Sequence, residues 1–272
     1  MVLPAGHAPA KLNLTLHVTG RRPDGWHLLD SLVVFARLGD SVAPGESPGL
    51  VVDGPMAAGV PAGADNLVLR AAALAGVAAP ALRLTKRLPA ASGMGGGSSD
   101  AAATLRLLGA RPDTAALMRL GADLPVCMVA PQPCRMRGLG EDVRPVASLP
   151  LLWLVLVNPG LPLSTPAVFA ALDVRENPPM PDPLPRFADV SALADWLSSQ
   201  RNDLEAPARR LAPPVGQVLN ALAAQPGCLL ARMTGSGATC FGIFASRARR
   251  DAAVRSLSRP GWFTAATETA HA

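Results

Sequence analysis

Apolar and polar residues alternate strictly over residues 11–18, which read KLNLTLHV. A period of two is typical of a β-strand with one buried face and one exposed face. The segment therefore predicts a half-buried strand, whose polar face carries Lys11, Asn13, Thr15 and His17. The turn-forming residues GRRPDGWH follow at 20–27, and the apolar run LLDSLVVFARL after them predicts a second strand, so the chain begins with a hairpin-like pair.

Several later segments show helical periodicity, with capping residues at their ends. The first is ADNLVLRAAALAGV, where Asp65 or Asn66 is the expected N-cap. Further helices are predicted at 98–110, 113–121, 164–172, 190–198, 202–211, 215–224 and 247–257. Strands are predicted at 81–88, 125–130, 134–142 (around a short turn), 151–157, 228–233, 240–246 and 261–270, with one more short strand among the loops between 41 and 64.

The order of these elements predicts an α+β fold. Strands and helices are mixed without a repeating strand–helix–strand rhythm, which argues against a doubly wound parallel sheet. The pattern resets near residue 148, where the apolar run LLWLVLV closes on the turn NPG. We therefore expect two domains, residues 1–147 and 148–272, with a proline-rich loop at 177–187 in the second.

The composition predicts a protein with a sizeable core and no membrane span. The chain has 272 residues, of which 49% are hydrophobic, yet LLWLVLV is its longest apolar run. This is far short of the ~20 residues of a membrane helix. The N-terminus lacks the regions of a secretion signal, and no Cys-x-x-Cys pair occurs among the four cysteines. These features predict a cytoplasmic location with reduced thiols, and place Cys127 and Cys240 in the core.

The net charge of +5 at pH 7 is compatible with binding either nucleic acid or an anionic small molecule. The basic residues form isolated pairs rather than a long run, and aromatic residues make up only 4% of the chain. This distribution argues against a nucleic-acid-binding protein. Of the 25 basic residues only Lys11 and Lys86 are lysine, which raises the hypothesis that both positions need a compact point charge.

The segment KRLPAASGMGGGSSDAAATLRLL, residues 86–108, places a glycine-rich loop directly before a helix start. Backbone N–H groups that lead into a helix N-terminus bind anions, and glycine lets the backbone come close to the ligand. The P-loop is excluded because the chain has no Gly-Lys pair, and Gly93 and Gly95 lack the third glycine of the dinucleotide fingerprint. From the pattern alone, the loop is either a flexible turn or a phosphate cradle.

The stretch LPAASGMGGGSSDAA resembles the second motif of the GHMP kinases, whose glycine–serine loop wraps the phosphates of ATP. Seven other segments match in the right order and extend the resemblance over nearly the whole chain: APAKLNLTLHVTGRRPDGWHLLDSL, DNLVLRAA, GADLPVCM, GLGED, NPGLPLSTPAVF, RNDLEAP and TGSGATCFGIF. The resemblance implies an N-terminal nucleotide-binding domain, a C-terminal α+β domain and an active site in the cleft between them. It also implies ATP as co-substrate, Mg²⁺, a small-molecule acceptor, no nucleic-acid or membrane partner, and a monomer or weak homodimer.

Within this family, the matching branch transfers the γ-phosphoryl group of ATP to the C2 hydroxyl of a methylerythritol that carries a cytidine diphosphate, in the non-mevalonate route to isoprenoid precursors. Such a transfer needs a base for the hydroxyl proton and cations for the developing charge. The resemblance assigns the base to Asp123, in GADLPV, and the neighbouring cation to Lys11. From the residues alone, Asp123 is an Asx-turn residue on a non-helical connection before Pro125, and Lys11 is a solvated cation.

The ATP-binding loop that the resemblance implies comprises Pro89, Ala90, Ala91, Ser92, Gly93, Met94, Gly95, Gly96, Gly97, Ser98 and Ser99. Either Ser98 or Ser99 is a candidate to contact Mg²⁺ through its hydroxyl group, and the metal ligands are otherwise unassigned. We expect Asp100 to be a carboxylate of the early helix rather than a metal ligand, and Lys86 to lie near the nucleotide.

The family holds cytosine between aromatic rings, and the resemblance implies which residues do so here. Trp26 occupies the position of the family's usual tyrosine, His27 would bond the edge of the base, and Phe169 is the candidate for its opposite face. Asn13 would reach the same pocket, and the turn at the wall of the cleft consists of Gly235, Ser236 and Gly237. Without the resemblance, all of these residues have plain structural roles in a strand, a turn, a helix core or a hairpin.

Three other functions stay open at this point. Another GHMP kinase, for homoserine, mevalonate or a sugar, shares the glycine loop but lacks the segment PDG-aromatic-His. A nucleic-acid-binding protein would show salt-sensitive binding to DNA or RNA and no ATP turnover. A nucleotide-binding protein without catalysis is disfavoured because both Lys11 and Asp123 are present.

Overall fold

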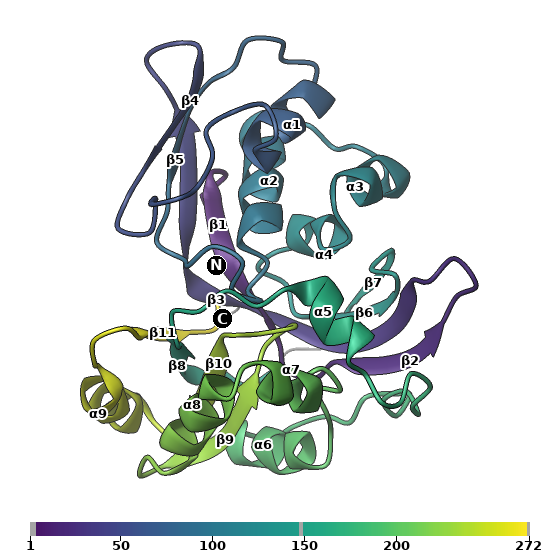
Figure 1. Cartoon of the computed structure of the whole chain (residues 1–272), viewed down its shortest axis with the longest axis vertical. Coiled ribbons are helices and arrows are strands. Elements are labelled where there is room, and N and C mark those ends of the chain that lie inside the picture. The colour runs from purple at the N-terminus through teal and green to yellow at the C-terminus, as the bar shows by residue number, and fades with distance from the viewer. Residues whose placement is uncertain (1–3, 147–148, 271–272) are drawn as a thin grey trace.

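The computed structural model describes residues 4–146 and 149–270, whose strands form two sheets (Figure 1). The strands of the first sheet are β1 (His7–Asn13), β2 (His17–Arg21), β3 (His27–Pro44), β4 (Gly49–Asp53), β5 (Ala81–Thr85), β6 (Cys134–Gly138) and β7 (Asp142–Pro145). Those of the second are β8 (Trp153–Asn158), β9 (Cys228–Met233), β10 (Cys240–Phe244) and β11 (Phe263–Glu268). The mixture of sheets and helices is the predicted α+β class.

Helices cover both sheets (Figure 1). Several of them begin at a side chain that accepts a hydrogen bond from the first turn. Those beside the first sheet are α1 (Leu67–Leu74), α2 (Gly96–Leu107), α3 (Thr114–Leu120) and α4 (Leu124–Met128). Those that follow along the chain are α5 (Thr165–Ala170), α6 (Val190–Ser198), α7 (Glu205–Leu211), α8 (Pro214–Ala223) and α9 (Arg247–Leu257). Asn66 caps α1 and Ser164 caps α5, as their sequences predict.

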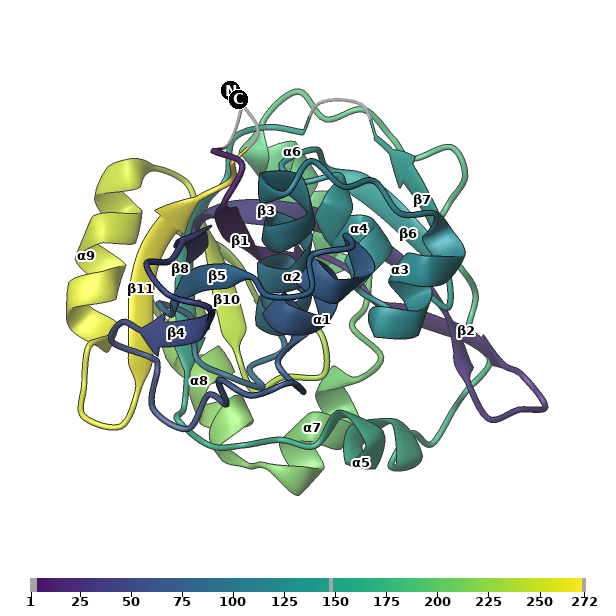
Figure 2. The same ribbon diagram turned by 90° about the horizontal axis from the view of Figure 1, so that it is seen from above.

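Strand β3 is the spine of the first sheet, because four strands pair with it. β1 pairs with residues 33–41 and β2 with residues 27–30. β6 pairs with residues 29–33 and β5 with residues 41–44. All four pairings are antiparallel, so one 18-residue strand fixes how β1 sits relative to β6. The hairpin of β2 and the start of β3 projects from the body of the protein (Figure 2).

The two sheets pack face to face through one apolar layer. From the first sheet it contains Ala10, Leu12, Leu14, Leu32, Val34 and Ala36, and from the second Leu154, Leu156, Phe241 and Ile243. Lys11 and Asn13 lie on the other face of β1, where they are also buried. The predicted half-buried strand over 11–18 is therefore wrong in two respects: both faces are covered, and the strand is interrupted between Asn13 and His17.

Two further expectations need correction. Residues 125–130 do not form a strand, because Leu124–Met128 are the helix α4. Its first four residues are buried, so no helical period marks it, and Pro125 falls in the first turn, where its missing N–H costs nothing. One strand–helix–strand unit also exists, since β4 and β5 are parallel neighbours with α1 between them.

The expected domain boundary, between residues 147 and 148, lies outside the described residues. No helix within the described ranges is long and apolar enough to span a membrane. Cys127 and Cys240 are buried in the core, as predicted. Burial raises the pKa of Cys127 to about 12, so its thiol stays protonated at neutral pH.

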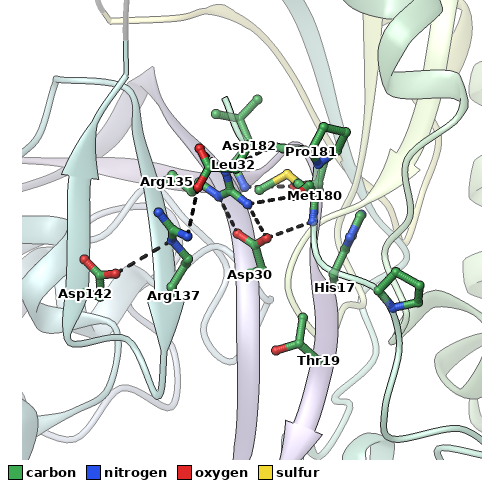
Figure 3. Close-up of polar contacts among 12 residues, drawn as sticks. His17, Thr19, Asp30, Leu32, Arg135, Arg137, Asp142, Met180, Pro181 and Asp182 are labelled. Carbon is green, nitrogen blue, oxygen red and sulfur yellow. Dashed lines mark hydrogen bonds and ion pairs between the residues drawn. The ribbon is translucent and has the colours of Figure 1, made fainter. Parts of the chain in front are cut away.

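A buried ion pair anchors the proline-rich loop 177–187 to the first sheet. Asp30 of β3 accepts two hydrogen bonds from Arg135 of β6, at 2.7 Å from Nε and 2.6 Å from Nη2. The same carboxylate accepts the backbone N–H of Met180, and Arg135 donates to the carbonyl oxygens of Met180 and Pro181. Figure 3 shows this arrangement, with Asp182 at its outer edge. The loop is thus held at a fixed place on the sheet.

This anchor predicts a large effect of Arg135→Met on stability. The substitution leaves Asp30 buried without a counter-charge, and we expect the free energy of unfolding to fall by about 3–5 kcal/mol. Urea denaturation followed by circular dichroism measures the change. Asp182→Asn is the matched control, because Asp182 approaches the same arginine at 3.6 Å but is 61% exposed, and it should cost no more than about 1 kcal/mol. Equal losses in the two variants would contradict the anchoring role.

Candidate active site

Lys11 and Asp123 form an ion pair at the end of the first sheet. The Nζ of Lys11 lies 2.7 Å from Oδ1 of Asp123. The lysine side chain is only 5% exposed, so Lys11 is not the solvated cation that the residues alone predict. The aspartate side chain is 34% exposed. A buried cation therefore supports a carboxylate that an incoming ligand can still reach.

Asp123 owes its position to the short helix α4. It is the N-cap residue of that helix, with φ −86° and ψ −5°, and its side chain makes no capping hydrogen bond. The backbone N–H of Cys127 bonds to its carbonyl oxygen. The expectation of a non-helical, Asx-turn carboxylate is thus wrong: the backbone is helical and the side chain pairs with Lys11.

The glycine loop covers Lys11 and runs directly into α2. The backbone N–H of Lys11 donates to the carbonyl of Met94, and a Cβ at Gly95 would lie 3.3 Å from Cβ of Lys11. Gly95, with φ +65°, is the N-cap of α2 and offers no side-chain acceptor to the first turn. The first helical bond runs from Ser99 N–H to Gly95 O. The preceding N–H groups are therefore left for an anion, as a phosphate cradle requires.

The glycine loop packs against the turn between β9 and β10, backbone to backbone. A Cβ at Gly93 would come within 2.6 Å of the carbonyl oxygen of Thr234 and 2.7 Å of that of Gly237. A Cβ at Gly235 would come within 2.6 Å of the carbonyl oxygen of Gly93. The N–H of Thr239 donates to the carbonyl of Ser92. Two segments expected at one cleft, 89–99 and 235–237, are thus in direct contact.

Asn13 has a fixed orientation beside this contact. Its backbone N–H donates to Oγ1 of Thr234, and its Nδ2 donates to Oγ of Ser31 at 2.7 Å. Because the hydroxyl of Ser31 donates in turn to the carbonyl of Thr15, it can only accept from Asn13. The amide therefore keeps Oδ1 as its free acceptor, and that atom is buried with no hydrogen-bond partner among the residues that the structure describes. A buried orphan acceptor is a feature that a bound donor would satisfy.

His27 and Phe169 stack on each other, with ring centroids 4.9 Å apart and planes inclined by 24°. Nε2 of His27 is buried and has no hydrogen-bond partner in the part of the chain that the structure describes. Burial lowers the pKa of His27, and the charges of Arg21 and Arg175 lower it further, so the imidazole is neutral at pH 7. Trp26 instead stands 61% exposed at the tip of the β2–β3 hairpin, and it makes no ring contact among the described residues.

The two candidate metal-binding serines differ in their surroundings. Ser99 is buried and donates to the carbonyl of Pro9, so its hydroxyl serves the fold. The hydroxyl of Ser98 makes no hydrogen bond within 4–146 and 149–270 and stays partly exposed. No group of three histidine, cysteine, aspartate or glutamate residues in these ranges is arranged to hold a metal ion.

Beneath the glycine loop lies a buried triad of charged residues. Nζ of Lys86 donates to Oδ2 of Asp40 and, at 2.8 Å, to Oδ2 of Asp100. Asp40 also accepts the backbone N–H groups of residues 87 and 88. A Cβ at Gly96 would lie 3.6 Å from the ammonium nitrogen, so Lys86 sits directly under the first residue of α2. Asp100 is thus a paired carboxylate of the early helix; nucleotide contact by Lys86 stays a prediction.

The sequence of this chain matches models of known protein families. The model described as "GHMP kinases N terminal domain" matches residues 63–130, and "GHMP kinases C terminal" matches residues 185–261, together more than half of the chain. A protein of Dinoroseobacter shibae named 4-diphosphocytidyl-2-C-methyl-D-erythritol kinase is 57% identical, over 97% of this chain and 94% of its own length. The chain belongs to the GHMP kinases.

Solved structures of GHMP kinases share its fold. A crystal structure of 4-(cytidine 5'-diphospho)-2C-methyl-D-erythritol kinase aligns with a TM-score of 0.78 and 34% identity, over 98% of this chain and 99% of that one. A mevalonate kinase of L. major in complex with R-mevalonate aligns with a TM-score of 0.63 and 16% identity, over 97% and 95% of the two chains. At that identity the second match shows the fold alone.

One residue of this GHMP kinase that sequence reasoning missed is Asn202, in the segment RNDLEAP. Its Nδ2 donates to the carbonyl oxygens of Met233 and Gly235, and so fixes the turn that packs on the glycine loop. Ser31 was missed as well, although it orients the amide of Asn13. Asn202 could have been found, because RNDLEAP is one of the segments that carry the family resemblance. No sequence pattern indicates the role of Ser31, because that role depends on strand pairing.

The triad predicts how Asp100→Asn changes the pH dependence of stability. Burial raises the pKa of Asp100 above its ordinary 3.8, Lys86 opposes the rise, and Asp40 adds to it. The native state then holds a proton that the unfolded state has released, so this group's stabilising contribution is present at acid pH and is lost as pH rises through the raised pKa. We expect the variant to gain stability relative to the wild type as pH increases.

Urea denaturation at a series of pH values between about 5 and 8 tests this expectation. Asp195→Asn, an exposed aspartate on α6, is the matched control and should follow the wild-type profile. Parallel profiles for Asp100→Asn and the wild type would show that Asp100 titrates as it does in the unfolded chain.

Proposed function

We propose that this GHMP kinase phosphorylates the C2 hydroxyl of 4-diphosphocytidyl-2-C-methyl-D-erythritol with ATP, giving the 2-phosphate and ADP, in the non-mevalonate route to isoprenoid precursors. The relatives that carry this enzyme's name support the substrate, since they match at 50–57% identity over nearly the whole chain. The observation that carries the chemistry is the contact between Lys11 and Asp123 beneath the glycine loop.

The chemistry follows from the charges in the site. Asp123 accepts the proton of the acceptor hydroxyl as its oxygen attacks the γ-phosphorus. The ammonium of Lys11, 2.7 Å from that carboxylate, lies where it can also stabilise the nucleophilic oxygen. The N–H groups at the start of α2 bind the phosphates of ATP and hold them in line with the hydroxyl.

Mg²⁺ fits this site through the nucleotide rather than through a protein cage. The described residues offer no cluster of three metal-binding side chains, and hard Mg²⁺ is commonly held by substrate phosphates with one or two protein oxygens. Ser98 is the residue that would hold it, because its hydroxyl is free of other hydrogen bonds within the described residues. When bound, the ion neutralises charge on the phosphate oxygens.

The cytidine end of the substrate is recognised by three rings: Trp26 in the β2–β3 turn, His27 at the start of β3 and Phe169 on α5. A neutral imidazole has one donor and one acceptor nitrogen, which suits the edge of cytosine, and the unpartnered Nε2 of His27 is available for it. Phe169 offers a ring face and Trp26 a second one on the projecting hairpin. Asn13 and the turn 235–237 complete the substrate contacts of this proposal.

Other expectations stay predictions. They are the division into residues 1–147 and 148–272, a cytoplasmic location, a monomer or weak homodimer, and the absence of a nucleic-acid partner.

A coupled ADP-release assay tests the function and the catalytic pair together. We expect turnover with the cytidine substrate and none with mevalonate or homoserine. Lys11→Ala and Asp123→Asn should each lose most of kcat with folding intact, because the first removes the buried cation and the second the proton acceptor. Asp195→Asn, exposed on α6, is the control and should keep the wild-type rate. Near-normal turnover by either site variant would refute its assignment.

The rings of Phe169 and Trp26 predict a separate effect on binding of the cytidine substrate. Base stacking is worth ~1–3 kcal/mol per base, so Phe169→Ala and Trp26→Ala should each raise KM for the cytidine substrate by about tenfold. KM for ATP should stay unchanged in steady-state titrations. Phe187→Ala removes a ring that contacts Trp196 instead, with centroids 5.4 Å apart, and serves as the matched control. An unchanged KM in Phe169→Ala would remove this ring from the acceptor site.

A further inference from the structure

We propose that Gly140, in the segment GLGED, is a positioning residue for Asp123, an inference that rests on the catalytic role proposed above for that carboxylate. The segment is one of the eight that carry the family resemblance, and no role has yet been attached to it. Gly140 touches neither substrate by this proposal. It acts through the backbone that carries Asp123.

Gly140 lies in the tight turn that joins β6 to β7. Its N–H donates to the carbonyl of Arg137 at 3.3 Å, and the side chain of Glu141 accepts the N–H of Leu139 at 2.6 Å. Gly140 is buried although the turn is short, because the segment before α4 lies against it. The turn is fixed to the sheet through β6, whose residues pair with the spine strand β3.

The contact between the turn and that segment leaves no room for a side chain. A Cβ at Gly140 would lie 2.3 Å from the carbonyl oxygen of Ala122 and 3.2 Å from its carbonyl carbon. The three nearest atoms to this position all belong to Ala122. The φ of Gly140 is +124°, which residues with side chains rarely adopt. Glycine is therefore required at this position for the close approach itself and for the backbone conformation.

The carbonyl of Ala122 belongs to the peptide group that leads into Asp123. An ordinary van der Waals contact begins at 3.4 Å, so an added methyl group at Gly140 must move this peptide group by about 1 Å. α4 cannot follow freely, because Leu124 at its start is buried and Arg106 donates to the carbonyl of Cys127 near its end at 3.0 Å. The displacement therefore falls on Asp123, whose carboxylate is 2.7 Å from Lys11.

Gly138, the last residue of β6 before this turn, provides a control. It also has a positive φ, of +73°, so an alanine there is strained as well, although less than at the φ of +124° of Gly140. A Cβ at Gly138 would meet the carboxylate of Glu141, at 2.3 Å from Oε1, and that exposed side chain can swing away. Gly138→Ala thus strains the turn without pressing on the peptide group before Asp123.

The experiment compares Gly140→Ala and Gly138→Ala in the full-length protein. We measure kcat and KM for both substrates, the thermal midpoint, and the crystal structure of each variant. Misplacing a catalytic group by about 1 Å costs about 100-fold in rate, and we expect a loss of that size in kcat for Gly140→Ala alone. KM for ATP should stay near the wild-type value, and both variants should lose thermal stability, Gly140→Ala more than Gly138→Ala because its methyl group meets backbone. The contact of Lys11 with Asp123 should open in Gly140→Ala and persist in Gly138→Ala.

Three results from kinetics and folding would overturn the proposal, and a fourth would come from the crystal structure. The first is a wild-type kcat for Gly140→Ala, and the second is an equal loss of kcat in both variants, which would assign the effect to turn strain. The third is a Gly140→Ala protein that does not fold or bind ATP, which would give the glycine a purely structural role. If the wild type itself did not phosphorylate the cytidine substrate, the proposed function would fail separately. An intact contact between Lys11 and Asp123 in the Gly140→Ala crystal would still refute the positioning.

Discussion

The close approach of two glycine-rich segments is the constraint on which the candidate site depends. Gly93 faces the carbonyl oxygens of Thr234 and Gly237 at distances that no side chain would permit. The contact holds the loop before α2 against the turn between β9 and β10, and the backbone N–H of Asn13 joins the same turn through Thr234. Lys11, two residues before Asn13 on β1, is covered by Gly95 of the loop. The contact therefore places a cation of the first sheet and a turn of the second sheet beside the same glycine loop.

Most elements of the fold could be predicted because their signals are local. The apolar run LLWLVLV closed by NPG, the helix start at Ser164 and the glycine after the helix at 114–120 each depend on a few neighbouring residues. The errors occur where a distant segment decides. The segment 11–18 is predicted to have one exposed face, because the glycine loop that covers this face lies some eighty residues later in the sequence. The helix α4 escaped prediction because burial around its whole first turn removes the helical period.

For the candidate site, too, the sequence predicted some features and not others. The family resemblance named candidate residues, and the structure brings Lys11, Asp123, the glycine loop and the turn 235–237 together. Sequence could not choose between Ser98 and Ser99, because the choice depends on the carbonyl of Pro9 that occupies the hydroxyl of Ser99. Nor could it foresee that His27 would stack on Phe169 while Trp26 stands apart, since that depends on how α5 meets the hairpin.

The two lysines of the chain show why composition carried some of this information. Both are almost completely buried, and each joins a carboxylate from another element: Lys11 with Asp123, and Lys86 with Asp40 and Asp100. Glycines lie beside both side chains: a Cβ at Gly95 would lie 3.3 Å from Cβ and 3.4 Å from Cε of Lys11, and one at Gly96 would lie 3.6 Å from Nζ of Lys86. A planar guanidinium is wider than an ammonium and presents its donors in a fixed fork. Buried arginines occur in this chain where that fork fits, as Arg135 does on Asp30. In a chain that uses arginine for almost every cation, both lysines are buried beside glycines and pair with carboxylates of other elements.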